Sequence, residues 1–248
     1  NIGLDSFVFF DDDPVNRELI KETMPEITAP DLPHDPSFYS EVIQSLHDFS
    51  TFQITSEDTK RGQMYLEQKQ RIKSQNSLSD ISEFLKTLNL EIEIKKTNSF
   101  TIPRISQLTL KTNQFNLTTK RYQEDEIQKF SEDTNILINC AQIKDKFGDN
   151  GITGVFIVKK TNSDEWFLDT FLLSCRVMGR EAEKAMLYFI INQAKKNNVK
   201  RLKAKFIPTL KNKPIEDFLP SSQFYEENGF WIYDLEKPFN MPEFLTLQ

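Results

Sequence analysis

The hydrophobic pattern of the chain changes period at one point, between Leu173 and Arg180. Residues 166–173 are an almost continuous apolar run, which is typical of a strand buried on both faces. From Arg180 onward, apolar residues recur at i, i+3, i+4 and i+7, and this predicts a helix that packs through most of its circumference. The first N–H groups of such a helix have no intrahelical partner. The sequence therefore predicts a strand, an anion-binding turn and a core helix.

The segments around this unit predict a sheet flanked by helices. Residues 90–96 alternate strictly between apolar and charged positions, which is the pattern of a half-buried strand. Residues 136–143 and 152–158 flank a turn rich in glycine and Asx residues, and they predict an antiparallel hairpin. The remaining expected elements are helices near 102–112 and 123–130, strands near 202–206 and 231–234, and a helical region between those two strands.

The first part of the chain has a different pattern. Residues 4–10 (LDSFVFF) are mostly apolar and predict a buried strand, which Asp11, Asp12 and Asp13 follow directly. Pro14 suits the first turn of a helix, so we expect a helix to come next. Adjacent carboxylates repel one another unless a cation or N–H groups compensate, which makes Asp11 and Asp12 candidate Mg²⁺ ligands. The alternative is that Asp12 or Asp13 caps the helix.

The segment from residue 51 to 88 predicts two helices. Thr55 and Asp58 match a capping box ahead of a long charged helix to about Ser74, and Ser77 is expected to cap a shorter helix. Because the long helix has few apolar positions, we expect it to link two units rather than fill a core. We therefore divide the chain into residues 1–50, 51–88 and 89–248.

Composition limits the classes of function. The chain has 248 residues, with 31 Lys and Arg against 37 Asp and Glu, and its net charge of −6 gives no reason to expect a nucleic acid as partner. No apolar run approaches the ~20 residues of a membrane span, and the N-terminus lacks the pattern of a signal peptide. Cys140 and Cys175 make no disulfide framework. We expect a cytoplasmic protein that does not bind membranes.

Positive charge is concentrated after the predicted core helix. Eight Lys and Arg residues between positions 195 and 213 are interrupted by no Asp or Glu. On an acidic chain, such a run favours an anionic ligand or an acidic partner, and Lys200, Arg201, Lys203 and Lys205 form its densest part. The alternative is a solvated, lysine-rich surface.

The turn before the core helix carries a short motif. Residues 176–181 (RVMGRE) are close to the R/Q-x-x-G-x-G/A turn with which GNAT acyltransferases hold the pyrophosphate of coenzyme A. The resemblance makes Arg176, Val177, Gly179 and Arg180 candidate cofactor-binding residues, although Glu181 replaces the last small residue. The later pattern N…FYxxxGF resembles the GNAT segment that packs beside coenzyme A, and it adds two candidates, Asn212 and Tyr225. The order of the expected elements is also that of a GNAT domain, with a mixed, mostly antiparallel sheet.

Longer segments extend the resemblance to nearly the whole chain. The chain resembles the FkbH family, in which a HAD-type phosphatase-like domain is joined to a GNAT-like domain. The segments that carry this resemblance are LDSFVFFDDDPVNRE at 4–18, LPHDPSFY at 32–39, KTNQFNLTTKRY at 111–122, DKFGDNGITGV at 145–155, DTFLLSCRVMGRE at 169–181 and PTLKNKPIEDF at 208–218. The resemblance implies that residues 1–50 are the C-terminal remnant of a HAD-like α/β domain and that 89–248 form a GNAT-like acyltransferase domain.

The family resemblance implies an activity. It implies transfer of a small phosphate-activated acyl unit, such as glyceryl, onto the phosphopantetheine thiol of an acyl carrier protein in polyketide-type biosynthesis. The HAD nucleophile motif Asp-x-Asp-x-Thr is absent from this chain, so we expect no phosphatase activity from it alone. Mg²⁺ at Asp11 and Asp12 is expected only with a complete HAD-like domain.

Four residues are candidates for the acyl-transfer chemistry. Cys175 lies where the strand meets an outward-facing helix start and is flanked by Arg176, and both features favour a thiolate that could carry an acyl thioester. The alternative is a small buried cysteine. Asn113, Gln114 and Asn116 are candidates for orienting a small acyl group, or else they only satisfy the local backbone.

Two other functions remain open from the sequence. The first is a GNAT N-acyltransferase that uses acyl-CoA and an amine, which needs a carboxylate or a water-relayed base beside the thioester, with Asp169 and Glu165 as candidate carboxylates. The second is a module without catalytic activity that docks a carrier protein through the basic run. Binding of coenzyme A separates the first of these from the other readings.

Overall fold

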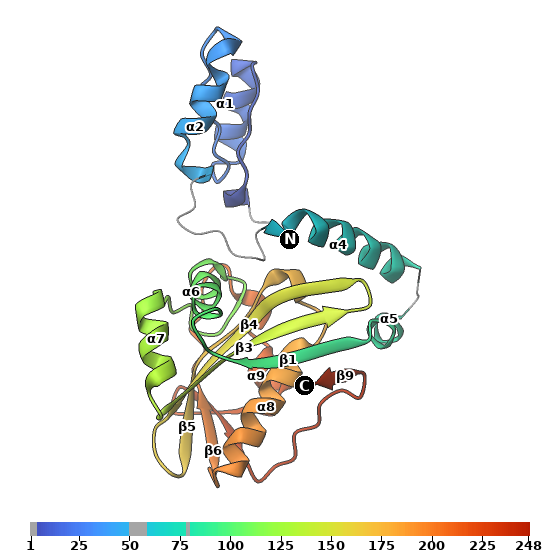
Figure 1. Ribbon diagram of the computed structural model, residues 1–248, viewed down its shortest axis with the longest axis vertical. Helices are drawn as coiled ribbons and strands as arrows, with labels where there is room; N and C mark the ends of the chain where they lie inside the picture. Colours follow the sequence, from blue (N-terminus) through green and yellow to red (C-terminus); the bar gives the residue numbers. More distant parts are fainter. Residues whose placement is uncertain (1–3, 50–58, 78–79) are drawn as a thin grey trace. The chain divides into compact units, whose positions relative to one another are not determined.

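A computed structural model describes residues 4–49, 59–77 and 80–248 (Figure 1). The chain divides into two compact units, Asn1–Ile54 and Thr55–Gln248. In the part of the chain that the structure describes, no helix has the length and apolar character needed to cross a membrane.

The first unit is built from short helices. Its elements are η1 (Leu4–Ser6), α1 (Pro14–Thr23), η2 (Pro36–Phe38), α2 (Tyr39–Ser45) and η3 (His47–Phe49). The helix predicted after the aspartates is confirmed, and Asp13 is its N-cap because its carboxylate accepts a hydrogen bond from Val15 N at 2.9 Å.

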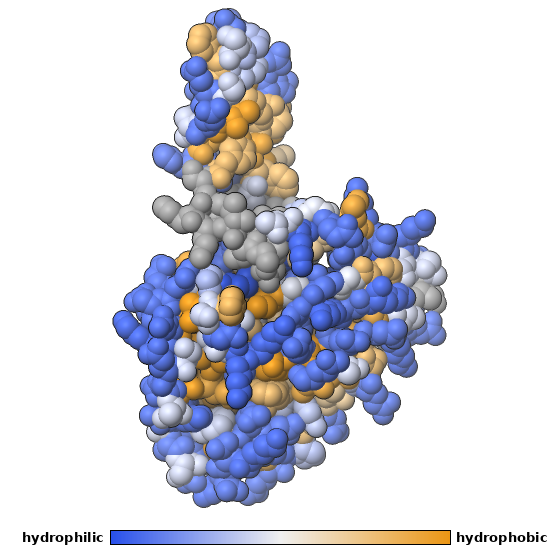
Figure 2. Space-filling view, viewed as in Figure 1, coloured by the Kyte–Doolittle hydropathy of each residue, from blue (hydrophilic) through white to orange (hydrophobic). Residues whose placement is uncertain are grey.

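The buried strand predicted for residues 4–10 is wrong. This segment begins with the 3₁₀ turn η1, and its only recorded strand pairing among the described residues is a parallel bridge between Val8 and Thr28. A strand needs neighbours on both edges to bury two apolar faces, and one bridge does not supply them. Apolar side chains consequently reach the surface of this unit (Figure 2), including Leu4, Phe7 and Val15.

The second unit is organised around a mixed sheet. In the described residues the strand order is β7-β8-β6-β5-β4-β3-β1-β9, and β2 pairs with β5 off this path. The strands are β1 (Leu90–Lys96), β2 (Phe115–Asn116), β3 (Ile136–Asp145), β4 (Gly148–Lys160), β5 (Glu165–Leu173), β6 (Arg201–Ala204), β7 (Tyr225–Glu227), β8 (Phe230–Asp234) and β9 (Leu245–Leu247). Only the pairs β1–β9 and β5–β6 are parallel among them. The predicted mixed, mostly antiparallel sheet and its 136–158 hairpin are confirmed.

Helices cover both faces of this sheet. Alternation along β4 sends Phe156 and Val158 toward α8 (Ala182–Lys196), while Val155 and Ile157 face α6 (Ile102–Lys111) and α7 (Glu124–Glu132). Burial of α8 on most of its sides agrees with the predicted core helix. The helix begins two residues later than predicted, because Glu181 adopts a left-handed conformation with φ +61°. The remaining short helices, η5 (Lys213–Ile215) and α9 (Phe218–Ser221), lie between β6 and β7.

The two helices expected as linkers belong to the second unit. They are α4 (Arg61–Asn76) and α5 (Ile81–Thr87). The expected capping box at Thr55 and Asp58 falls outside the described residues. Ser77 is the C-cap of α4 rather than the N-cap of the next helix; Asp80 caps α5 and accepts a hydrogen bond from Ser82 N.

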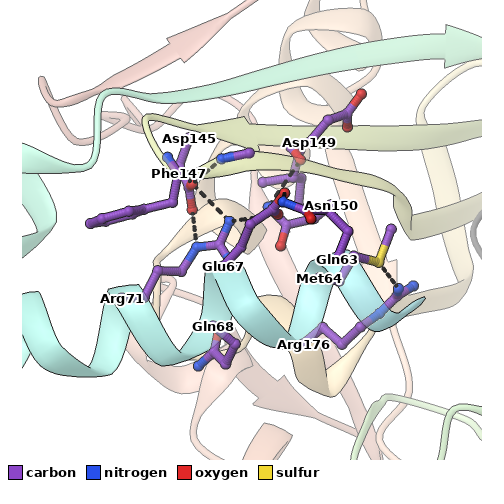
Figure 3. A network of polar contacts seen from close by, with 12 residues as sticks. Gln63, Met64, Glu67, Gln68, Arg71, Asp145, Phe147, Asp149, Asn150 and Arg176 are labelled. Atoms are coloured by element: carbon purple, nitrogen blue, oxygen red, sulfur yellow. Dashed lines mark hydrogen bonds and ion pairs between the residues drawn. The ribbon is translucent and has the colours of Figure 1, made fainter. Parts of the chain in front are cut away.

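Charged side chains hold α4 on the β3–β4 hairpin (Figure 3). The fully buried carboxylate of Asp145 accepts two hydrogen bonds from Arg71, Nε–Oδ2 at 2.7 Å and Nη2–Oδ1 at 2.9 Å. Glu67 lies against the hairpin at Gly148, where a Cβ atom would come within 2.2 Å of the Glu67 carboxylate. The Arg71 guanidinium lies over the face of the Phe147 ring, with 5.8 Å between the guanidinium carbon and the ring centroid. The charged helix is therefore packed on the sheet through its polar side chains.

Asp145→Asn should destabilise the second unit strongly. The substitution keeps the side-chain shape but removes the carboxylate that the buried Arg71 and Arg180 guanidinium groups share. Loss of one partner of a buried pair costs roughly 3–5 kcal/mol. The matched control is Asp149→Asn on the same hairpin, where the side chain is exposed and the free energy of unfolding should change by less than about 0.5 kcal/mol. Urea denaturation measures both. Equal midpoints for the two variants would show that the Asp145 cluster does not support the fold.

Candidate functional site

The turn between β5 and α8 is open at its glycine. The chain leaves β5 through the 3₁₀ turn η4 (Cys175–Val177) and reaches Gly179, whose φ is +76°. A Cβ atom placed on Gly179 would meet no atom within 4 Å, so the backbone here is accessible. The carboxylate of Glu181 pairs with Lys184 at 2.9 Å, which offsets the negative charge beside the helix start. Of the first N–H groups of α8, that of Lys184 donates to the Glu181 carbonyl oxygen at 3.0 Å and that of Glu183 contacts its own carboxylate, whereas the N–H of Ala182 has no i−4 partner within the helix.

The two arginines of this turn are engaged by the protein itself. Arg180 is buried; its Nη1 donates to Asp145 Oδ2 at 2.9 Å, and its Nη2 donates to Gln68 Oε1 at 3.1 Å and to the Arg176 carbonyl oxygen at 2.6 Å. Burial and the nearby Arg71 charge lower the pKa of Arg180 to about 10, so the guanidinium stays charged at neutral pH. Arg176 contacts Met64 of α4 (Figure 3). What the turn offers an anion is mainly its backbone.

The other residues of the turn differ in exposure. Val177 is fully buried in the core below α8, so its side chain does not face solvent. Cys175 is half-buried at the first position of η4, two residues after β5 ends at Leu173. Cys140, by contrast, is fully buried in the middle of β3. The structure therefore leaves Cys175 as the more accessible thiol.

Asn116 and Asn212 lie together and organise a loop. Both are fully buried; Asn212 Nδ2 donates to the Asn116 carbonyl oxygen at 3.0 Å and to the Ile207 carbonyl oxygen at 2.9 Å. Asn116 Nδ2 donates to the Thr112 carbonyl oxygen, and its Oδ1 accepts from the backbone of Thr119 at 2.9 Å. Both side chains form hydrogen bonds with nearby backbone groups. Asn116 therefore agrees with the alternative that it satisfies the local backbone instead of orienting an acyl group.

The remaining candidates are not brought to one place. Asn113 is partly buried and its Oδ1 accepts a hydrogen bond from Arg121, while Gln114 is partly buried next to it in the loop. Tyr225 is exposed on β7, with the Lys237 ammonium 5.6 Å from its ring centroid. Asp11 belongs to the first unit; its Oδ1 accepts from Asp13 N at 2.9 Å, and its carboxylate also accepts from Asn16.

No metal centre forms in the part of the chain that the structure describes, since no group of three or more His, Cys, Asp or Glu side chains is arranged to hold an ion there. Asp12 is exposed beside Asp11, and its carbonyl oxygen accepts from Arg17 Nη1 at 3.0 Å. A Mg²⁺ role for Asp11 and Asp12 needs further ligands and stays a prediction.

The β2 segment covers one edge of β5. Phe115 and Asn116 pair with Leu173 and Leu172, and Leu117 continues this pairing by donating its N–H to the Phe171 carbonyl oxygen at 3.1 Å. On its other side, the Leu117 carbonyl oxygen accepts from Ile207 N at 2.9 Å. The segment therefore lies between β5 and the chain that follows β6, beyond the point where these two parallel strands stop pairing.

A second polar cluster surrounds Asp169 in the middle of β5. Thr170 pairs with Ile157 and Leu168 with Val158, so Asp169 is the extra residue of a β-bulge. Its Oδ1 accepts from Lys120 Nζ at 2.6 Å and pairs with Lys159 Nζ at 2.9 Å. Its Oδ2 accepts from the Tyr122 hydroxyl at 2.6 Å and from the Thr170 hydroxyl at 3.1 Å.

These contacts decide the charge of the cluster. Burial acts to raise the pKa of Asp169, but the hydrogen bonds from Lys120, Tyr122 and Lys159 outweigh it and the pKa is lowered. Burial and the neighbouring Asp169 carboxylate raise the pKa of the Tyr122 hydroxyl. Asp169 is therefore an ionised, fully hydrogen-bonded carboxylate and a weak base. From the sequence, Asp169 was a candidate base only. A single charged residue within an apolar strand is the feature that could have indicated a buried ion pair there.

Similarity of this chain to known proteins is found only among solved structures. No family model matches this chain, and no curated protein sequence matches it. Solved structures that it is similar to include the ribosomal-protein-S18-alanine N-acetyltransferase from Escherichia coli, at 14% identity and TM-score 0.43, covering 55% of this chain and 79% of that one. A GNAT-family acetyltransferase from Staphylococcus aureus has 13% identity and TM-score 0.45, covering 58% and 99%. The PaiA N-acetyltransferase from Thermoplasma acidophilum, solved with coenzyme A, has 13% identity and TM-score 0.40, covering 57% and 96%.

The strand order decides the fold. A strand, two helices and an antiparallel hairpin lead into β5, and α8 then connects β5 to its parallel neighbour β6. The second unit therefore has the mixed α/β element order that the sequence predicts for a GNAT-like domain, and it is called the GNAT-like unit below. In this GNAT-like unit, the open turn at Gly179 and the Asp169 cluster are both positioned by β5.

Asp169→Asn should change how the stability of the GNAT-like unit depends on pH. Because the folded pKa of Asp169 lies below its ordinary value of 3.8, its ionised form stabilises the folded state above that value. The stabilisation is lost as pH falls through the folded pKa. The difference in unfolding free energy between wild type and variant should thus be largest near neutral pH and shrink below about pH 4. Urea denaturation across this range measures it; a constant difference would show that Asp169 ionisation is not linked to folding.

Proposed function

We propose that the GNAT-like unit is an acyltransferase that accepts its acyl group from a phosphopantetheine thioester, with acyl-CoA as the first donor to test. The observation that carries this proposal is the accessible Gly179 backbone ahead of the N-terminus of α8. Unpaired N–H groups at a helix start bind phosphate oxygens, and the helix dipole adds to the attraction. The acyltransferase fold supports the same class of reaction.

The turn before α8 suits the phosphate end of such a ligand, whereas the edge of β5 does not suit its pantetheine arm. The phosphate groups would lie at the backbone of Gly179 and Ala182, where Glu181 is already paired with Lys184. When bound, the thioester would supply the activated acyl group. Its arm could not add to the β5 edge beside Phe171, because Leu117 already occupies that carbonyl oxygen. The acyl group would instead lie near Cys175 at the end of β5.

A second candidate is transfer to an acyl carrier protein, as the FkbH resemblance implies. In this proposal residues 1–50 are the remnant of a HAD-like domain, the donor is a small acyl phosphate such as that of glyceryl, and Cys175 carries the acyl unit. The basic run supports docking only in part, because Lys200 pairs with Asp164 at 3.2 Å and Lys203 with Glu165 at 3.7 Å. Both Lys200 and Arg201 remain largely exposed to solvent.

Gly179→Asp should weaken binding of coenzyme A by at least about tenfold, because the added carboxylate would stand beside the bound phosphates. The matched control is Gly229→Asp, since Gly229 has nearly the same conformation, φ +75° against φ +76°, and the same open surroundings. Both variants should lose similar stability from the strained backbone. Isothermal titration calorimetry with coenzyme A measures binding. Equal affinities for the two variants, or no binding by wild type, would reject the acyl-CoA proposal.

Cys175→Ser separates the covalent carrier-protein route from direct transfer. If Cys175 holds the acyl unit, the full-length protein with its acyl donor should form an adduct that hydroxylamine removes, and this adduct should be lost in Cys175→Ser. The control is Cys140→Ser, which alters a buried thiol and should keep the adduct. Intact-protein mass spectrometry detects the adduct. Transfer at the wild-type rate by Cys175→Ser would mean that the acceptor attacks the donor directly.

A further inference from the structure

The Asp169 cluster holds more positive charge than its carboxylate needs. Lys120 Nζ and Lys159 Nζ lie 2.6 and 2.9 Å from the same oxygen, Asp169 Oδ1, so the two nitrogens are within about 5.5 Å of each other. Like charges this close repel one another, and one carboxylate offsets only one of them. The described residues give neither lysine any other carboxylate partner within 4 Å. The cluster therefore carries one excess positive charge.

The two ammonium groups face outward and the carboxylate faces inward. The side chains of Lys120 and Lys159 are 39% and 40% exposed, whereas that of Asp169 is 1% exposed. Each ammonium group has three N–H donors and uses one on Asp169, so donors remain for a molecule arriving from solvent. The Asp145 cluster is different in this respect, because both of its arginines are buried. An ion pair that served only the fold would not need a second, half-exposed cation.

The carboxylate that holds the lysines is itself fixed from several sides. The Tyr122 and Thr170 hydroxyls donate to its second oxygen, and the Thr118 hydroxyl donates to the Asp169 carbonyl oxygen at 2.9 Å. Tyr122 is buried against Phe130 of α7, with 5.0 Å between the ring centroids. These contacts keep Asp169 at one place in the bulge. The lysines are thus drawn together before any ligand binds, which lowers the entropy cost of binding.

We propose that Lys120 and Lys159 form a binding site for a small anion, the phosphate or carboxylate group of a low-molecular-weight ligand. Two ammonium groups at this separation can both contact the oxygens of one such group, and charge-assisted hydrogen bonds of this kind are strong. The assignment goes beyond the proposed acyltransferase function, because that function uses the backbone around Gly179 and requires no anion at Asp169.

The test is a titration of ¹⁵N-labelled protein with inorganic phosphate, and separately with malonate, at constant ionic strength. Backbone amide signals of residues 118–122 and 159 should shift and saturate. Lys159→Gln and Lys120→Gln should each weaken this binding by at least about tenfold. The matched control is Lys160→Gln, which removes the same charge one residue away. Neighbouring side chains on a strand point to opposite faces, and Lys160 Nζ donates to the Thr134 carbonyl oxygen instead.

One further variant makes the outcome decisive. Gly179→Asp should leave the shifts of residues 118–122 unchanged, and this separates the site from the turn before α8. Stronger binding of phosphate or of malonate identifies the preferred group, and either supports the proposal. It is overturned if neither anion gives saturable shifts at these residues, or if Lys160→Gln weakens binding as much as Lys159→Gln.

Discussion

The buried carboxylate of Asp145 is the interaction on which the GNAT-like unit depends most. It joins three segments that are far apart in the sequence: α4 through Arg71, the β3–β4 hairpin that carries it, and the turn before α8 through Arg180. Glu67 adds a second carboxylate 3.6 Å from Arg71, so two cations and two anions are buried together. Desolvated charges are tolerated only when each is paired, and this couples the position of the turn to the position of α4.

This coupling has a consequence for the functional site. An arginine next to a glycine turn suggests a phosphate ligand, but Arg180 is committed to Asp145 and to the Arg176 carbonyl oxygen. Its role is to hold the turn in shape. Under the proposed function, recognition of an anion there would depend on backbone N–H groups and on the accessible Gly179. Such groups distinguish the charge and shape of the bound group but not the identity of the rest of the ligand.

The two charged clusters of the unit differ in where their cations lie. Around Asp145 the guanidinium groups are inside, fixed by hydrogen bonds to side chains and backbone, and the cluster belongs to the packing of α4. Around Asp169 the carboxylate is inside and the ammonium groups are half-exposed. A β-bulge directs the Asp169 side chain, and bulges are frequent next to binding sites because they re-aim one residue without breaking the sheet. The Asp145 cluster, with its buried cations, is therefore structural, whereas the half-exposed cations of the Asp169 cluster are accessible to a ligand.

The sequence by itself determined the elements whose apolar pattern is clear within one segment. The core helix α8, the alternating strand β1, the hairpin of β3 and β4 and the strand β5 were all predicted, with ends that differ by a few residues. The tertiary structure alone decided which charges meet. Arg71, Asp145 and Arg180 come from a helix, a strand and a turn that are far apart in the sequence, so the local patterns show them only as polar positions. The same holds for Lys120, Lys159 and Asp169. Periodicity shows which face of one element is apolar, whereas the partner of a buried charge depends on how distant elements pack. Residues 4–10 show that even an apolar run forms a strand only where neighbouring strands are available to pair with it.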